Sequence, residues 1–285
     1  MNTEATPFRL CAFADEADKK LTGQIAALQG NGMSLIELRG VDGKNVAALT
    51  VDEAKETARR LEDNGISVWS IGSPIGKVEI TAPAVEEMDR FKRVLETAVI
   101  CKAPNIRLFS FFGTEGDEAC LDEVCRRLDD MITVARGTGV RLCHENEKGI
   151  YGDNADRCLQ LYRALPELGG IFDPANFVQC HQDTLGAWAV LRHYISYAHI
   201  KDARLDGHVV PPGTGAGCLG TLLREFAGAG IEVLTLEPHL KVFKGLAELE
   251  GGKRPDVGGE DLVFTTGREA FDYAANTLKS LISAM

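Results

Sequence analysis

Short apolar segments alternate with longer amphipathic segments along the whole sequence. Each short segment is apolar enough for a buried strand and ends in polar or turn residues, while each longer segment repeats apolar positions at helical spacing. The predicted strands are residues 8–13, 35–38, 66–71, 106–111, 140–145, 170–173, 195–201 and 232–237. The predicted helices are about 15–30, 51–62, 85–101, 117–136, 153–165, 184–193, 219–229 and 268–282. The pattern therefore predicts eight β/α units.

Strands that alternate with helices favour a parallel sheet covered by helices, and the count of eight favours closure into a single (β/α)8 TIM barrel. An open doubly wound sheet is the alternative, but no Gly-x-Gly-x-x-Gly follows the first strand. Asp15, Glu16 and Asp18 follow it instead, as acids suited to the cap and first turn of a helix. No linker divides the sequence, so we predict one domain over residues 1–285, with a polar, glycine-rich loop at about 241–266.

Polar side chains stand at the ends of four consecutive predicted strands, the fifth to the eighth. They are Glu145, Asp173, His199 and Glu237. The carboxyl ends of barrel strands meet at one mouth. Three carboxylates gathered there with an imidazole would repel one another when ionised, unless a cation lies between them. Taken singly, Asp173 before a proline suits a helix cap, and His199 suits a core histidine. Their joint occurrence favours a shared metal site, and such ligands suit Mn²⁺, Mg²⁺, Co²⁺ or Zn²⁺.

The period of two along a strand sorts the neighbours of these residues onto two faces. If the four candidate ligands point inward, the residues that share their face are Cys143, Ile171, Tyr197, Lys201, Val233 and Thr235. The residues that then face the helices are Leu142, Phe172, Ala198, Ile200, Leu234 and Leu236. The same rule turns His144 away from the ion, and we interpret Trp69 as core packing.

The composition is that of a soluble globular protein, with 45% hydrophobic and 26% charged residues. No apolar run approaches the ~20 residues of a membrane span, and the first residues lack the basic and apolar regions of a signal peptide, so we expect a cytoplasmic protein. The net charge of -11 argues against nucleic-acid partners and acidic membranes. The eight cysteines have no Cys-x-x-Cys spacing, which favours reduced thiols. The amphipathic outer helices are compatible with a subunit interface, so a homo-oligomer is one expectation.

Several further residues are placed to contact a small-molecule substrate near the ion. Glu37 and Arg107 lie at the ends or inner faces of strands two and four, and Lys201 lies two positions beyond the candidate histidine ligand. Each suits hydroxyl or phosphate oxygens, although a salt bridge inside the barrel explains Glu37 and Arg107 equally well. Lys77, in a loop after strand three, and His239, two positions beyond the last candidate ligand, are also candidates. For these two the alternatives are a solvated lysine and a loop histidine.

Seven short stretches carry a resemblance to a known family. They are residues 13–16 (FADE), 36–39 (IELR), 71–77 (IGSPIGK), 144–146 (HEN), 172–177 (FDPANF), 199–202 (HIKD) and 236–239 (LEPH). From strand one to strand eight they resemble the sugar phosphate isomerase/epimerase family of xylose isomerase-like barrels. The resemblance implies one divalent ion held by the same four residues, and a sugar or polyol as substrate. Where several members have a histidine, this sequence has Asn176, which can bind a substrate hydroxyl but cannot act as an acid or base.

The resemblance also implies a reaction. Glu145 and Glu237, on opposite sides of the ion, would be the base and acid of an isomerase or epimerase that moves a proton through a metal-stabilised enediolate. The substrate would be a sugar, keto-sugar or polyol, with or without phosphate. A lyase of the inosose dehydratase type is the close alternative, because elimination starts from the same enolate. A hydrolase like endonuclease IV is disfavoured by the negative charge and six scattered histidines, and a sugar-binding barrel without turnover is the non-enzymatic alternative.

Overall fold

The central feature of the fold is a parallel sheet of eight strands that curls into a nearly closed barrel. The computed structural model describes residues 7–242 and 263–285, so most of the predicted loop at 241–266 lies outside the described residues. The barrel strands are β1 (Arg9–Ala12), β2 (Leu35–Leu38), β5 (Ser67–Ile71), β6 (Asn105–Leu108), β7 (Arg141–Glu145), β8 (Gly169–Phe172), β9 (Ile195–Ile200) and β12 (Val233–Leu236). Their order is β1-β12-β9-β8-β7-β6-β5-β2, and β1 also contacts β2. Each strand thus lies beside its neighbour in sequence, which confirms the TIM barrel and excludes the doubly wound sheet, whose strand order reverses.

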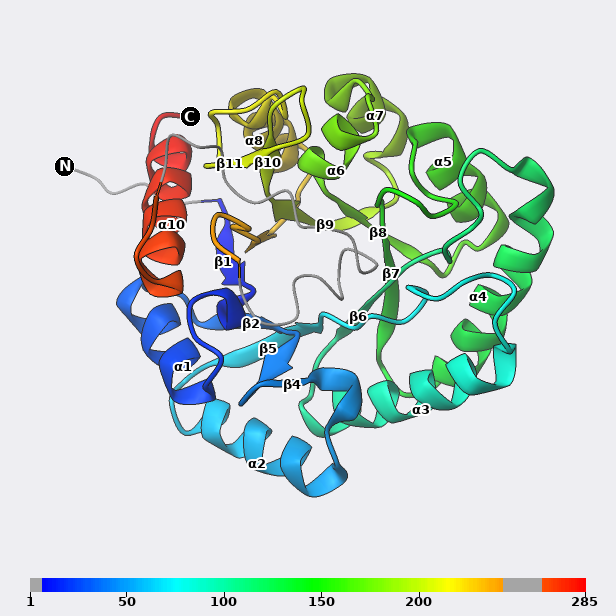
Figure 1. Cartoon of the computed structure of the whole chain (residues 1–285), viewed down its shortest axis with the longest axis horizontal. Helices are drawn as coiled ribbons and strands as arrows, with labels where there is room; N and C mark the ends of the chain where they lie inside the picture. The colour runs from blue at the N-terminus through cyan, green and yellow to red at the C-terminus, as the bar shows by residue number, and fades with distance from the viewer. Residues whose placement is uncertain (1–6, 243–262) are drawn as a thin grey trace.

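A long helix follows each barrel strand, and Figure 1 shows these helices as a ring around the strands. They are α1 (Leu21–Gly30), α2 (Val51–Glu62), α3 (Ala84–Ile100), α4 (Leu121–Ala135), α5 (Ala155–Ala164), α7 (Thr184–Leu191), α8 (Leu219–Gly228) and α10 (Gly267–Ser283). Local signals define some of their ends. α2, for example, begins at a capping box between Thr50 and Glu53. Within the described residues, no helix is both long and apolar enough to span a membrane.

The first predicted helix is divided in the structure. A 3-10 turn, η1 (Ala14–Glu16), follows β1, and α1 begins only at Leu21. Asp15 and Glu16 do not cap α1, because both accept hydrogen bonds from the guanidinium group of Arg39 at the end of β2. The prediction of a helix from about residue 15 was therefore wrong: ion pairing with Arg39 uses the two acids that were interpreted as helix-start residues.

Additional short elements occur in the loops after the strands. They are the hairpins β3 (Gly40–Val41) with β4 (Lys44–Asn45) and β10 (Asp202–Ala203) with β11 (Val209–Val210), the 3-10 helices η2 (Val46–Ala48) and η3 (Glu118–Cys120), and α6 (Pro174–Gln179). The residue pattern does not predict α6, which follows β8 directly. Asp173 is its N-cap, since Asp173 Oδ1 accepts the backbone N–H of Asn176 at 2.9 Å. The capping role considered for Asp173 is therefore present, and its other oxygen remains available for a second contact.

The side chains of the barrel strands separate into an inner and an outer layer. The inner cluster is Cys11, Leu35, Cys143, Ile171, Tyr197 and Val233, with Trp69 packed against it. The outer cluster includes Leu142, Phe172, Ala198, Ile200, Leu234 and Leu236. This separation confirms the predicted alternation of faces and the core position of Trp69. His144 faces outward as predicted, with its Nε2 3.0 Å from Ser110 Oγ.

Candidate metal centre

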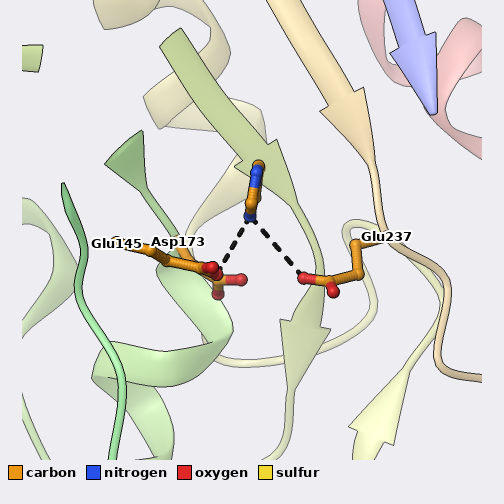
Figure 2. A group of neighbouring side chains, drawn as sticks. Glu145, Asp173 and Glu237 are labelled. Atoms are coloured by element: carbon orange, nitrogen blue, oxygen red, sulfur yellow. Dashed lines mark hydrogen bonds and ion pairs between the residues drawn. The ribbon is translucent and has the colours of Figure 1, made fainter. Parts of the chain in front are cut away.

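Four polar side chains meet where β7, β8, β9 and β12 end. They are Glu145, Asp173, His199 and Glu237, and each offers one ligand atom that lies within 4.8 Å of the other three. All four side chains are buried, with no more than 2% of any residue exposed. Figure 2 shows Glu145 and Asp173 on one side of the group and Glu237 on the opposite side, with their carboxylates pointing toward one another. The structure therefore brings together the four residues that the strand ends predicted.

The imidazole of His199 lies between carboxylates on both of its edges. Its Nδ1 is 2.9 Å from Glu145 Oε1 and 3.6 Å from Glu237 Oε2. Its Nε2 is 3.1 Å from an oxygen of Glu37, which is itself only 1% exposed. His199 therefore directs Nδ1 toward other candidate ligands and Nε2 toward Glu37, a carboxylate outside the group.

Two predicted substrate residues, Lys201 and Arg107, form ion pairs with the cluster. The ammonium group of Lys201 lies 3.0 Å from Asp173 Oδ2 and 3.2 Å from Glu237 Oε2. Arg107 Nη1 lies 3.1 Å from Glu145 Oε2. The interior salt bridge considered for Arg107 is thus present, and both cations offset part of the negative charge that burial concentrates here.

The pKa values show how strongly the buried groups depend on one another. Burial and the nearby carboxylates raise the pKa of Asp173 to about 7. Burial acts in the same direction on Glu145, but His199 and Arg107 outweigh it and lower the pKa of Glu145 to about 2. Burial acts to lower the pKa of His199, yet Glu145 and Glu37 outweigh it and raise that pKa to about 10. A proton on His199 thus compensates the carboxylates when no ion is bound, which is a role that a divalent cation can take over.

Asn176 and Lys77 lie at different distances from the cluster. Asn176 Nδ2 is 3.3 Å from Glu145 Oε1, so its amide contacts a candidate ligand directly. Lys77 Nζ instead lies 3.1 Å from Glu147 Oε2 and borders a cavity of about 410 Å³ beside the cluster. The lining of this cavity includes Asp15, Glu16, Arg39, Pro74, Lys77 and Lys241. The cavity provides space for a small molecule on the side of the mouth formed by the ends of β1, β2 and β5.

Arg39 also belongs to the candidate site, although it was not among the residues predicted from the sequence. Its Nη1 lies 2.9 Å from Glu237 Oε1, and its Nη2 lies 3.0 Å from Glu16 Oε1. Its Nε and Nη2 each donate to Asp15 at 3.0 Å, so this pair is bidentate. Two signals could have identified it: Arg39 lies two positions after Glu37, on the same face of the strand, and it belongs to one of the family-like stretches.

His239 completes the same side of the site. Its Nε2 lies 3.4 Å from Glu237 Oε1 and 3.4 Å from Glu16 Oε1, and its backbone N–H donates to Glu16 at 2.7 Å. Burial lowers the pKa of His239 well below its usual range, although Glu237 opposes this effect. His239 is therefore a buried residue of the loop after β12 that contacts a candidate ligand, so it is a loop histidine that also borders the site.

Fold and site together define a TIM barrel whose mouth carries a buried cluster of carboxylates and one imidazole. A family model described as a xylose isomerase-like TIM barrel matches residues 25–250. The chain belongs to this family, which confirms the resemblance found in the sequence. No curated protein matches the sequence at a significant level.

Solved structures with the same fold include enzymes of different activities. D-psicose 3-epimerase from Clostridium cellulolyticum H10 superposes with a TM-score of 0.73 at 12% identity, covering 96% of this chain and 98% of the epimerase. The probable 3-DHS dehydratase AsbF from Bacillus anthracis gives 0.71 at 16% identity, over 96% and 98% of the two chains. A xylose isomerase-like TIM barrel protein from Mycobacterium smegmatis, in complex with magnesium, gives 0.69 at 15% identity, over 98% of each chain. At these identities the likeness shows the fold alone.

Proposed function

We propose that this chain is a divalent-metal-dependent isomerase or epimerase of a sugar, keto-sugar or polyol. The observation that carries the proposal is the group of four buried ligand atoms on four consecutive strand ends. The epimerase among the similar structures and the magnesium in another support it. Glu145, Asp173, His199 and Glu237 are the proposed ligands.

The geometry and chemistry of the four donors fit a single ion. Two ligands that each lie about 2.1 Å from one ion are at most about 4.2 Å apart. The four ligand atoms lie within 4.8 Å of one another, so only small side-chain movements are needed. Three carboxylates and one imidazole suit Mn²⁺, Mg²⁺, Co²⁺ or Zn²⁺.

An ion held by the four proposed ligands would supply Lewis-acid chemistry: it would polarise a substrate carbonyl and offset the negative charge that develops when a neighbouring carbon loses its proton. Glu145 and Glu237 approach the site from opposite sides and are the proposed base and acid. Arg107 holds Glu145 in place, whereas Arg39 and Lys201 hold Glu237. Opposed carboxylates allow a proton to leave one face of a carbon and return to the other, which is the requirement for epimerisation.

A lyase is the second candidate function, because one of the similar structures is a probable dehydratase. Elimination begins with the same proton removal and ends with loss of a hydroxyl group as water. A dehydratase would form an enone or diketone that absorbs in the ultraviolet, whereas an epimerase would not. A hydrolase with a histidine-rich, multi-metal site is disfavoured, since the clusters found among the described residues contain only His199 and His239.

Solvent deuterium uptake tests the proposed function. The Mn²⁺-loaded protein would be incubated in D₂O with a panel of ketoses and keto-polyols, and each substrate would be analysed by mass spectrometry and ultraviolet absorbance. We expect one deuterium to enter a substrate, and we expect the variant E145Q to exchange it at least ~100-fold more slowly while it still binds some metal. Exchange by E145Q at the parent rate would reject Glu145 as the base.

A further inference from the structure

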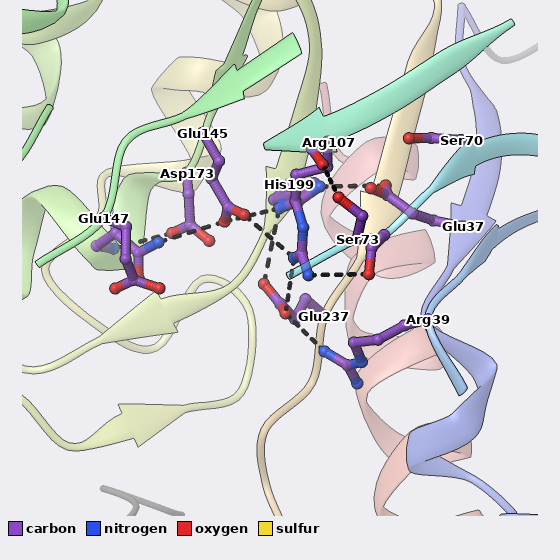
Figure 3. Close-up of polar contacts among 12 residues, drawn as sticks. Glu37, Arg39, Ser70, Ser73, Arg107, Glu145, Glu147, Asp173, His199 and Glu237 are labelled. Atoms are coloured by element: carbon purple, nitrogen blue, oxygen red, sulfur yellow. Dashed lines mark hydrogen bonds and ion pairs between the residues drawn. The ribbon is translucent and has the colours of Figure 1, made fainter. Parts of the chain in front are cut away.

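The two nitrogens of His199 have different surroundings. Figure 3 shows Glu37 on one side of this side chain and Glu145 on the other. Nδ1 faces the candidate ligands, and Nε2 lies 3.1 Å from Glu37 Oε2. A neutral imidazole that binds a cation through one nitrogen carries its proton on the other. The atom next to Glu37 is therefore the one that must hold the proton when Nδ1 holds an ion.

The carboxylate of Glu37 is also bound on the side away from His199. The hydroxyl of Tyr197 donates to Glu37 Oε1 at 3.0 Å and also lies 3.0 Å from Ser70 Oγ. Tyr197 belongs to the inner cluster that fills the barrel, and its ring contacts Trp69 with centroids 5.8 Å apart. The carboxylate of Glu37 is thus bound at one oxygen by the barrel core and at the other by His199.

The strand pairing is irregular at Glu37. The pairing of β2 with β5 shifts register between Ile36 and Glu37, and this shift places Glu37 beside Ser70. Such irregularities redirect side chains, and they are common next to functional sites. Because the imidazole of His199 lies between Glu37 and Glu145, Glu37 is poorly placed to contact a molecule bound at the cluster.

We propose that Glu37 is a positioning residue for the metal centre: it accepts the Nε2–H of His199 and so directs the lone pair of Nδ1 at the ion. This role replaces the substrate contact expected from the sequence, and it rests on the proposed metal-dependent function. A carboxylate in this position orients the imidazole and makes the coordinating nitrogen more basic. Tyr197 supports this role by its hydrogen bond to the other oxygen of Glu37, and Ser70 supports it indirectly through its contact with the Tyr197 hydroxyl.

The test is the metal affinity of E37Q, measured by calorimetric titration with Mn²⁺, together with the visible spectrum of the Co²⁺-loaded protein. Loss of such a partner weakens metal binding by about 10–100-fold. We therefore expect E37Q to bind Mn²⁺ about 10–100-fold more weakly than the parent and to show a changed Co²⁺ spectrum. E87Q is the matched control, because Glu87 is a glutamate with 5% exposure that accepts the Gly76 N–H away from the cluster. E87Q should bind Mn²⁺ as the parent does.

A second variant keeps the test decisive if E37Q does not fold. Y197F retains the carboxylate but removes the hydroxyl that fixes it, so we expect a smaller loss of Mn²⁺ affinity in the same direction. Parent-like affinity and spectrum in both E37Q and Y197F, with binding lost in H199A, would overturn the role of Glu37 while leaving the metal function intact. A parent protein that binds no Mn²⁺ would overturn the metal function first, and the role of Glu37 with it.

Discussion

Replacing Lys201 by methionine tests the charge balance of the metal centre. Lys201 is 5% exposed, and its ammonium group lies 3.0 Å from Asp173 and 3.2 Å from Glu237. Methionine keeps an unbranched apolar chain but removes the charge, so K201M leaves two buried carboxylates without this partner. Breaking a buried ion pair in this way costs about 3–5 kcal/mol. At roughly 2–4 °C per kcal/mol, we expect the Tm of the chelator-treated protein to fall by roughly 6–20 °C.

A bound divalent ion changes this expectation, because it compensates the same two carboxylates. Saturating Mn²⁺ should therefore raise the Tm of K201M by more than it raises the Tm of the parent. K77M is the control, since the Lys77 side chain is 7% exposed and pairs with Glu147 at 3.1 Å, outside the cluster. It should lower the Tm equally with and without Mn²⁺. The reasoning is refuted if K201M loses no stability in chelator, or loses as much in Mn²⁺ as in chelator.

Two further predictions concern residues outside the cluster. Burial lowers the pKa of His144 to about 4, whereas in the unfolded chain this pKa is about 6.5. The unfolded chain therefore takes up a proton first as the pH falls, and the stability present above about 6.5 is lost as the pH falls through about 4. Urea unfolding between pH 7 and pH 4 should show a shallower loss for H144Q than for the parent, and equal slopes would contradict this. G76A should cost more stability than G32A, because both glycines have positive φ but an added Cβ at Gly76 would meet the Phe109 carbonyl oxygen at 2.1 Å, whereas Gly32 has open space. Unfolding free energies should show about 1–2 kcal/mol lost in G32A and more in G76A; similar losses would mean that the loop adjusts.

The barrel and its candidate ligands followed from the sequence because both depend on short-range periodicity. Alternation along β9 separates Tyr197 and His199 from Ala198 and Ile200, and the structure shows this separation as an inner and an outer layer. Strand ends converge at one mouth in any closed parallel barrel. Residues separated by up to 92 positions, from Glu145 to Glu237, could therefore be grouped without knowledge of the helices between them.

The contacts between side chains from different strand ends could not be predicted in the same way. Alternation places Arg39 on the inner face, but only the path of η1 shows that it reaches Asp15 and Glu16 as well as Glu237. Likewise, the position of Glu37 behind His199 depends on an irregular register between β2 and β5, and no residue pattern specifies that register. Such contacts depend on loop paths and register rather than on periodicity.

Metal content tests the central claim most directly. Protein purified without chelator, and again after addition of Mn²⁺, Co²⁺ or Zn²⁺, would be analysed for elements beside the variants H199A and E237Q. The account predicts about one divalent ion per chain in the parent and loss of that ion in both variants. No ion in the parent under any of these conditions, or full retention in both variants, would contradict it.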